Sequence, residues 1–154
     1  MKRTKSIFLF CFSLVAFFGI AEESWAAGCS HRFGAGVGIV HTDEPSDTNV
    51  SVGAEYECRI NRLVGIGAFG DHVFADPSFT LLGAPQVLLH PLGGDFFVAA
   101  SPLIEFGSGI GTHVGARLST RLPIPLALFV LVPSFAVDFI GGHRNYWIGL
   151  GLAF

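Results

Sequence analysis

The last nine residues of the chain are the feature that most constrains its fold. Residues 146–154 alternate large apolar side chains with small ones and end on an aromatic residue. A half-buried strand of a soluble protein alternates apolar with polar side chains instead. A strand between lipid and a crowded barrel lumen matches the observed pattern. We therefore interpret the segment as the last strand of a transmembrane β-barrel, with its outward side chains at Tyr146, Ile148, Leu150, Leu152 and Phe154.

The N-terminal segment accounts for part of the chain's hydrophobic content, which is 51% of residues. Lys2, Arg3 and Lys5 precede an apolar stretch over residues 7–20, and small residues follow at 26–28. This order is typical of a secretory signal peptide. The alternative is a membrane-spanning helix, for which the apolar stretch is short. We predict a signal peptide at residues 1–27 and a single barrel domain at residues 28–154.

The remaining chain is mildly acidic. It carries six arginines and no lysine against ten aspartates and glutamates. Proteins that bind nucleic acid carry a basic patch or stripe, so we expect no nucleic-acid partner. The composition indicates no cofactor and gives no indication of an oligomeric state.

The apolar residues beyond the signal fall in short segments separated by glycine, proline and polar turns, unlike the long runs of membrane helices. We predict eight strands, at residues 32–41, 49–58, 63–71, 79–89, 95–105, 112–121, 126–138 and 144–154. Each is near the ~9–11 residues that a tilted membrane strand needs. The predicted fold class is all-β, an eight-stranded antiparallel up-and-down transmembrane β-barrel. The longer links, after the first, third and fifth strands, should be extracellular.

The seventh predicted strand is ambiguous, because residues 122–137 are nearly all apolar and could also form a helix. Pro123, Pro125 and Pro133 disfavour the interior of a helix. Ser134 and Asp138 share one parity, which a strand would point into the lumen. We therefore predict a strand.

Two cysteines, Cys29 and Cys58, follow the signal and lie at the same end of the first predicted hairpin. Exported proteins fold in an oxidising compartment, so one expectation is a disulfide between them and the other is two free thiols. Residues 26–29 also resemble a lipobox, but the usual leucine before the small residues is missing.

Charged side chains occupy the predicted inner face of several strands. An eight-stranded lumen is just wide enough for side chains, and glycines on the same faces leave room for long ones. Arginine and glutamate from opposite walls can meet there, because the planar guanidinium binds a carboxylate at two points. We interpret the set as a lumenal salt-bridge plug, with a narrow ion or proton path as the alternative. The set consists of Glu55, Glu57, Glu105, Arg117 and Arg121.

Histidines and aspartates near the predicted extracellular ends show no paired metal-ligand spacing, so we predict no metal site. We also predict no catalytic residues. His113 and Ser119 share a face but lie roughly 20 Å apart along a strand, too far for a Ser–His hydrogen bond. Ser108 could reach a histidine only if loops fold back. The residues concerned are His41, His72, His113 and His143, with Asp43, Asp71, Asp76 and Asp138.

The chain after the signal resembles the small eight-stranded outer-membrane β-barrel proteins of Gram-negative bacteria. The resemblance rests on the signal, the paired strands and the ending Tyr146–Phe154; residues 88–94 and 133–139 also resemble poorly characterised members. In that family the barrel-assembly machinery reads the terminal aromatic segment. The resemblance therefore implies this machinery as a partner, the outer membrane as the location, and contact with outer-membrane lipid and lipopolysaccharide.

The function that follows is an integral outer-membrane barrel with a filled lumen and short loops, in a structural or interaction role. One alternative is a lipid A-modifying enzyme, because some small outer-membrane barrels act on lipid A. A second alternative is a narrow channel. A soluble lipocalin-like barrel would need polar outward faces, which the Val, Leu and Phe positions of this chain do not provide.

Overall fold

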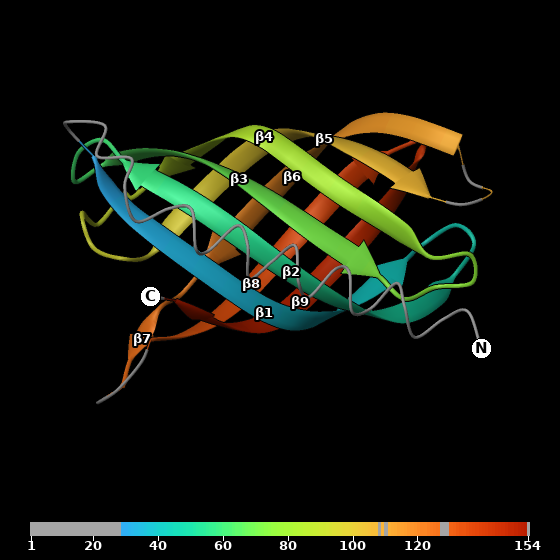
Figure 1. Ribbon diagram of the computed structural model, residues 1–154, viewed down its shortest axis with the longest axis horizontal. Coiled ribbons are helices and arrows are strands. Elements are labelled where there is room, and N and C mark those ends of the chain that lie inside the picture. The colour runs from blue at the N-terminus through green and yellow to red at the C-terminus, as the bar shows by residue number, and fades with distance from the viewer. Residues whose placement is uncertain (1–28, 108, 110, 127–129, 154) are drawn as a thin grey trace, which may run out of the picture.

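The computed structural model describes residues 29–107, 109, 111–126 and 130–153. Residues 1–27, Ser108 and Phe154 lie outside this part of the chain. Within it the chain forms eight long strands and one strand of two residues, β7 (Figure 1). The strands are β1 Ser30–Thr42, β2 Asp47–Arg59, β3 Val64–Val73, β4 Phe79–Leu89, β5 Phe97–Gly107, β6 Gly111–Arg121, β7 Ile124–Pro125, β8 Val130–Ile140 and β9 His143–Ala153.

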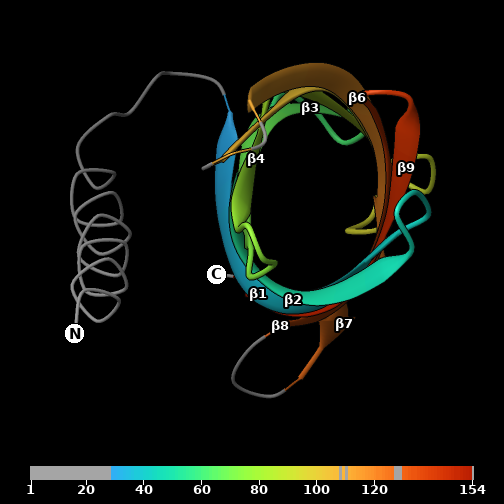
Figure 2. The same cartoon turned by 90° about the vertical axis from the view of Figure 1, so that its right-hand side faces the viewer.

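The long strands form a closed antiparallel barrel. Each long strand pairs with the next long strand along the chain, so β6 pairs with β8, and β9 pairs with β1 to close the barrel. Figure 2 looks along the barrel and shows the strands as a ring. The prediction of an all-β, eight-stranded antiparallel barrel is therefore confirmed. None of the described residues forms a helix that is long and apolar enough to cross a membrane.

The ambiguous segment before Asp138 is a strand, as predicted. β8 pairs with β6 on one side and with β9 on the other. It tolerates Pro133 opposite Leu150, although proline removes one donor from the ladder. The strand begins at Val130 rather than at residue 126, and β7 precedes it.

The predicted distribution of link lengths is wrong. The 90–96 link and the described residues 122–126, which include β7, lie at the end of the barrel where β1 begins and β9 ends, which we call the terminal end. At the opposite end, the hairpin end, β1 and β2 stay paired up to Thr42 and Asp47. Thr42, Asp47 and Thr48 are polar and resemble loop residues in sequence, but they belong to the strands. Gly141 and Gly142 turn the chain tightly there, with φ of 59° and 90°.

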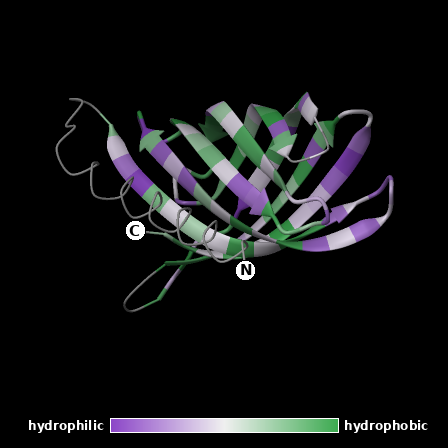
Figure 3. Ribbon diagram, turned by 45° about the vertical axis from the view of Figure 1, so that its right-hand side comes forward, coloured by the Kyte–Doolittle hydropathy of each residue, from purple (hydrophilic) through white to green (hydrophobic). Residues whose placement is uncertain are grey.

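The barrel wall is apolar on its outside. Along the long strands, exposed side chains alternate with side chains that point into the lumen, and in β4 the alternation changes phase at a bulge between Gly83 and Val87. The alternation appears as bands along the strands in Figure 3. The outward apolar residues include Val37, Ile39, Val50, Ile66, Leu82, Val87, Val98, Ile104, Val114, Leu118, Phe135, Phe139, Ile148 and Leu150.

The seam between β9 and β1 is built around Trp147, which points inward and is buried. Gly38 pairs with Gly149 across the seam. A Cβ on Gly149 would lie 2.0 Å from the indole, and one on Gly38 would lie 2.6 Å from it. Only glycine leaves room for the ring at these two positions. The indole Nε1 donates to Ser51 Oγ at 2.7 Å, so β9 is tied to β2 across β1.

Candidate functional site: the polar lumen

The centre of the lumen is organised by Arg117 on β6. Its guanidinium donates twice to Asp138, with Nη2 to Oδ2 at 2.8 Å, and also donates to Asp71. The guanidinium carbon lies 4.1 Å from the centroid of the Phe69 ring. All three charged residues are buried. One cation therefore serves two carboxylates, and their geometry is fixed by charge-assisted hydrogen bonds.

The strand pairing explains how these carboxylates reach Arg117. Asp138 is the direct partner of Arg117 in the pairing of β6 with β8, while Asp71 comes from β3. The sequence places both aspartates near the predicted extracellular ends and points Asp138 into the lumen; in the structure both side chains are buried in the lumen. β3 runs on to Val73, so Asp71 keeps the inward parity of Phe69 and Val73.

A second ion pair joins Glu55 on β2 to Arg121 on β6. These strands lie on opposite walls, since four steps separate them in either direction around the ring. The two side chains thus meet across the lumen, as the sequence predicts for a glutamate and an arginine from these strands. Each side chain is about one-sixth exposed.

The other two glutamates of the predicted plug face histidines rather than arginines. Glu57 Oε1 lies 2.7 Å from His90 Nε2, and the ring's Nδ1 lies 3.1 Å from the carbonyl oxygen of Gly94. Glu105 Oε2 lies 3.9 Å from His143 Nε2 and has no hydrogen-bond partner among the described residues. Sequence reasoning missed His90 because it follows the end of a strand. For Asp71 and Asp138, the sequence signal that could have assigned them to the lumenal plug was their position in the alternation of inward and outward side chains.

An apolar cluster packs in the lumen beside the Arg117 centre. Side chains from six strands pack together there, and each is at most 7% exposed. This apolar cluster consists of Val40, Phe69, Val73, Leu81, Leu103, Ala136, Ile140 and Trp147.

The terminal end of the lumen contains an open cavity with charged residues in its lining. This cavity measures about 260 Å³ and lies between Arg32, Phe33, Asp95, Phe97 and Val130, among others. The 90–96 link folds against this end, because Asp95 pairs with Arg32 and with Arg59. Arg59 also donates to the carbonyl oxygens of Arg62, Gly93 and Gly94.

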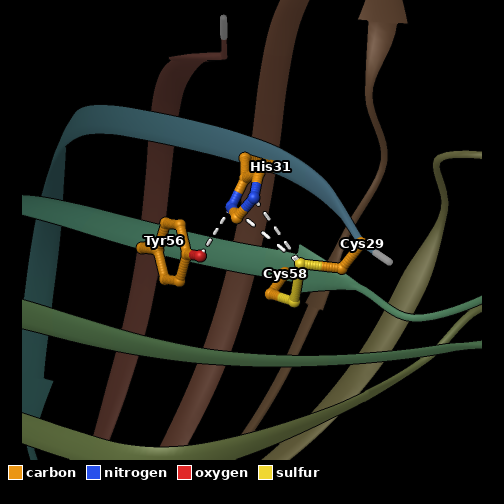
Figure 4. Close-up of a disulfide and its surroundings, with 4 residues drawn as sticks. All are labelled: Cys29, His31, Tyr56 and Cys58. Carbon is orange, nitrogen blue, oxygen red and sulfur yellow. Dashed lines mark hydrogen bonds between the residues drawn. A yellow bond between two sulfur atoms is a disulfide. The ribbon is translucent and has the colours of Figure 1, made fainter. Parts of the chain in front are cut away.

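A disulfide joins Cys29 to Cys58 at the terminal end, with 5.5 Å between the Cα atoms. Figure 4 shows it beside His31 and Tyr56. His31 Nδ1 lies 2.7 Å from the hydroxyl of Tyr56, and Nε2 lies 3.7 Å from the sulfur of Cys29. The bridge joins the residue directly before β1 to the penultimate residue of β2.

The histidines at the hairpin end do not converge on a common point. His41 Nδ1 lies 2.9 Å from Thr48 Oγ1, and His72 Nδ1 lies 3.0 Å from Thr80 Oγ1. No group of three or more His, Cys, Asp or Glu residues in the described ranges is placed to hold a metal ion. His113 is exposed, whereas Ser119 is buried in the lumen near Gln86. The possible role of Ser108 falls outside the described residues.

These features define a fold class: the chain has the fold of the small eight-stranded outer-membrane β-barrel proteins. It is similar to Neisserial surface protein A, with 13% identity over 82% of this chain and 98% of that one and a TM-score of 0.56. It is also similar to the N-terminal β-barrel domain of Pseudomonas aeruginosa OprF, with 11% identity, 82% and 99% coverage and a TM-score of 0.59.

A de novo designed transmembrane β-barrel shares the fold as well, with 9% identity over 80% of this chain and 95% of that one and a TM-score of 0.52. No protein-family model matches the chain. No curated protein sequence matches it significantly. At such low identities the likeness concerns the fold alone.

Proposed function

We propose that the protein is an integral outer-membrane β-barrel whose lumen is filled by side chains, and that its role is structural or interactive. The observation that carries the proposal is the contrast between the two faces of the wall. Large apolar side chains are exposed all around the barrel, while ionised groups are buried inside it. This arrangement suits lipid outside, because a soluble barrel would expose polar side chains there.

The filling of the lumen argues against an open channel. The void beside Arg117 measures about 10 Å³ and the one beside Gly36 and Gly53 about 30 Å³. A single water needs roughly 10–15 Å³ of such space, so these two voids have room for isolated waters and are too small for a continuous aqueous path. The apolar cluster packs directly beside the Arg117 centre, where Phe69 contacts the guanidinium, and it opposes the passage of hydrated ions.

The proposed export route and partners follow from the two ends of the chain. Residues 1–27 act as the cleaved signal, and the outward residues of β9 with Phe154 are read by the barrel-assembly machinery. The terminal end then faces the periplasm and the hairpin end faces outward, towards lipopolysaccharide. The links at the hairpin end are short, so contacts with lipopolysaccharide or a partner are made by the rim and the wall.

Two measurements test this function. Purified protein in a planar lipid bilayer should give no conductance steps, and lipid A from cells with and without the protein should have the same mass spectrum. Conductance steps from the wild-type protein would overturn the filled lumen. A changed acyl pattern of lipid A would overturn the non-enzymatic role and favour the lipid A-modifying alternative.

A further inference from the structure

The hairpin that contains β7 departs from the barrel wall. Figures 1 and 2 show it at the terminal end and outside the ring of strands. Its residues before the turn include Leu122, Ile124 and Leu126, which are 56%, 41% and 46% exposed. No charged residue occurs between Arg121 and Asp138.

The described side chains of this hairpin are apolar on both faces. Ile124 and Pro125 point to opposite faces, and both are exposed. The inner face, with Pro123 and Val130, lines the cavity at the terminal end. A hairpin whose outer face meets water places polar side chains there, as the 60–63 link at the same end does with Asn61 and Arg62. The outer face of the β7 hairpin is apolar instead, which fits contact with lipid on that face.

The free edge of β7 offers no backbone donor. The amide of Leu122 donates to the carbonyl of Pro133 at 3.1 Å, so Leu122 and Ile124 turn their backbone groups towards β8. The alternate residues, Pro123 and Pro125, turn theirs towards the open edge. β7 pairs with β8 only, among the described strands. Since unpaired N–H groups are costly in hydrocarbon, two prolines at these positions suit an edge that meets lipid.

The outer face of the hairpin is continuous with the apolar wall of the barrel. Ile124 pairs with Leu131, and Leu131 pairs with Leu152 on β9. Leu152 is one of the exposed apolar residues of the wall. A lipid surface that covers β9 therefore extends onto β7 without an intervening polar group.

We propose that residues 122–126, together with the start of β8, form a lipid-embedded projection that binds phospholipid acyl chains of the leaflet at the terminal end. The projection enlarges the contact between barrel and membrane on one side only. This inference rests on the proposed membrane location of the barrel.

Site-directed labelling of the folded full barrel in phosphatidylcholine vesicles tests the projection. Cys29 and Cys58 are bonded, so a single introduced cysteine takes the fluorescent label under non-reducing conditions. The test positions are Ile124→Cys and, independently, Leu126→Cys. The reference for lipid is Val114→Cys on the wall, and the matched control is Leu92→Cys, an apolar residue of the 90–96 link that is 82% exposed. Heat-modified gel migration verifies folding of each variant.

Labels at residues 124, 126 and 114 should be quenched several-fold more by nitroxide lipids than by a water-soluble nitroxide, and the label at residue 92 should show the reverse. Lipid quenching at residue 114 with aqueous quenching at residues 124 and 126 would overturn the projection and leave the membrane barrel intact. Aqueous quenching at residue 114 would overturn the membrane location itself. Equal lipid quenching at residues 92 and 124 would also overturn the projection, because the signal would then belong to the whole rim.

Discussion

The centre and the terminal end of the lumen are filled in different ways. At the centre, one arginine and two aspartates are buried together beside the apolar cluster. At the terminal end, the pair of Arg32 and Asp95 is partly exposed, with side chains 36% and 45% accessible, beside a cavity of about 260 Å³. The same barrel thus holds ion pairs in two environments. The difference separates charges that the fold depends on from charges that water can replace.

The largest effect is expected from Arg117→Leu at the buried centre. The substitution leaves the carboxylates of Asp71 and Asp138 buried without their cation. Removing one partner of a buried ion pair destabilises a protein by about 3–5 kcal/mol. Urea unfolding in micelles, followed by far-ultraviolet circular dichroism, should show a lower midpoint, and heat-modified migration should change.

A triple variant provides the control for that experiment. Arg117→Leu combined with Asp71→Asn and Asp138→Asn removes the unpaired charges together with the cation. It should recover much of the lost stability, because neutral amides cost far less to bury than carboxylates. An unchanged midpoint for Arg117→Leu alone would contradict the structural importance of the buried centre.

An intermediate effect is expected from replacing Cys29 and Cys58 together by serine. The bridge spans a sequence separation of 29 residues. Closing a loop of this size stabilises by about 2–4 kcal/mol, mainly through the unfolded chain. The double variant should therefore unfold at lower urea concentration, and wild-type protein in dithiothreitol should match it. A bridge without effect on the midpoint would mean that the strand pairing alone holds the terminal end.

The smallest effect is expected from Asp95→Ala at the terminal end. Its partners Arg32 and Arg59 remain near water and carbonyl groups, and exposed ion pairs contribute roughly 0–1 kcal/mol. The matched variant is Asp138→Ala, which removes a fully buried carboxylate from the Arg117 centre. Its midpoint should fall much further than that of Asp95→Ala. An equal fall in the urea midpoint of the two variants would contradict the difference between the buried Arg117 centre and the terminal end.

The barrel itself could be predicted from sequence because its pattern is local. The alternation of outward Val37 and Ile39 with inward glycines needs only the period of a strand. The partners of the lumenal charges could not be predicted in the same way. They depend on how far each strand is shifted relative to its neighbours, and the alternation of inward and outward side chains does not reveal this shift. Parity places Arg117 in the lumen, but the register of β6 with β8 gives it Asp138 rather than a glutamate.

The link lengths show a second limit of local reasoning. Residues 43–48 have the composition of a loop, yet the register of β1 with β2 keeps Asp47 and Thr48 in the ladder. Conversely, the 90–96 link is held in place by Arg59, which donates to Gly94, and by the contact of His90 with Glu57. Arg59 and Glu57 lie on β2, which β3 separates from β4, so the order of strands in the sheet brings them to the link.

Trp147 gives the closed barrel an optical signature. The chain has two tryptophans, and Trp25 lies in the predicted signal, so the exported chain would retain a single indole. That indole lies on β9, which closes the barrel by pairing with β1. It occupies the space left by glycines of β1 and β9 and donates a hydrogen bond to Ser51 on β2. The fluorescence emission of Trp147 should therefore change when β9 pairs with β1 and the barrel closes. Barrel closure can then be followed without an added dye.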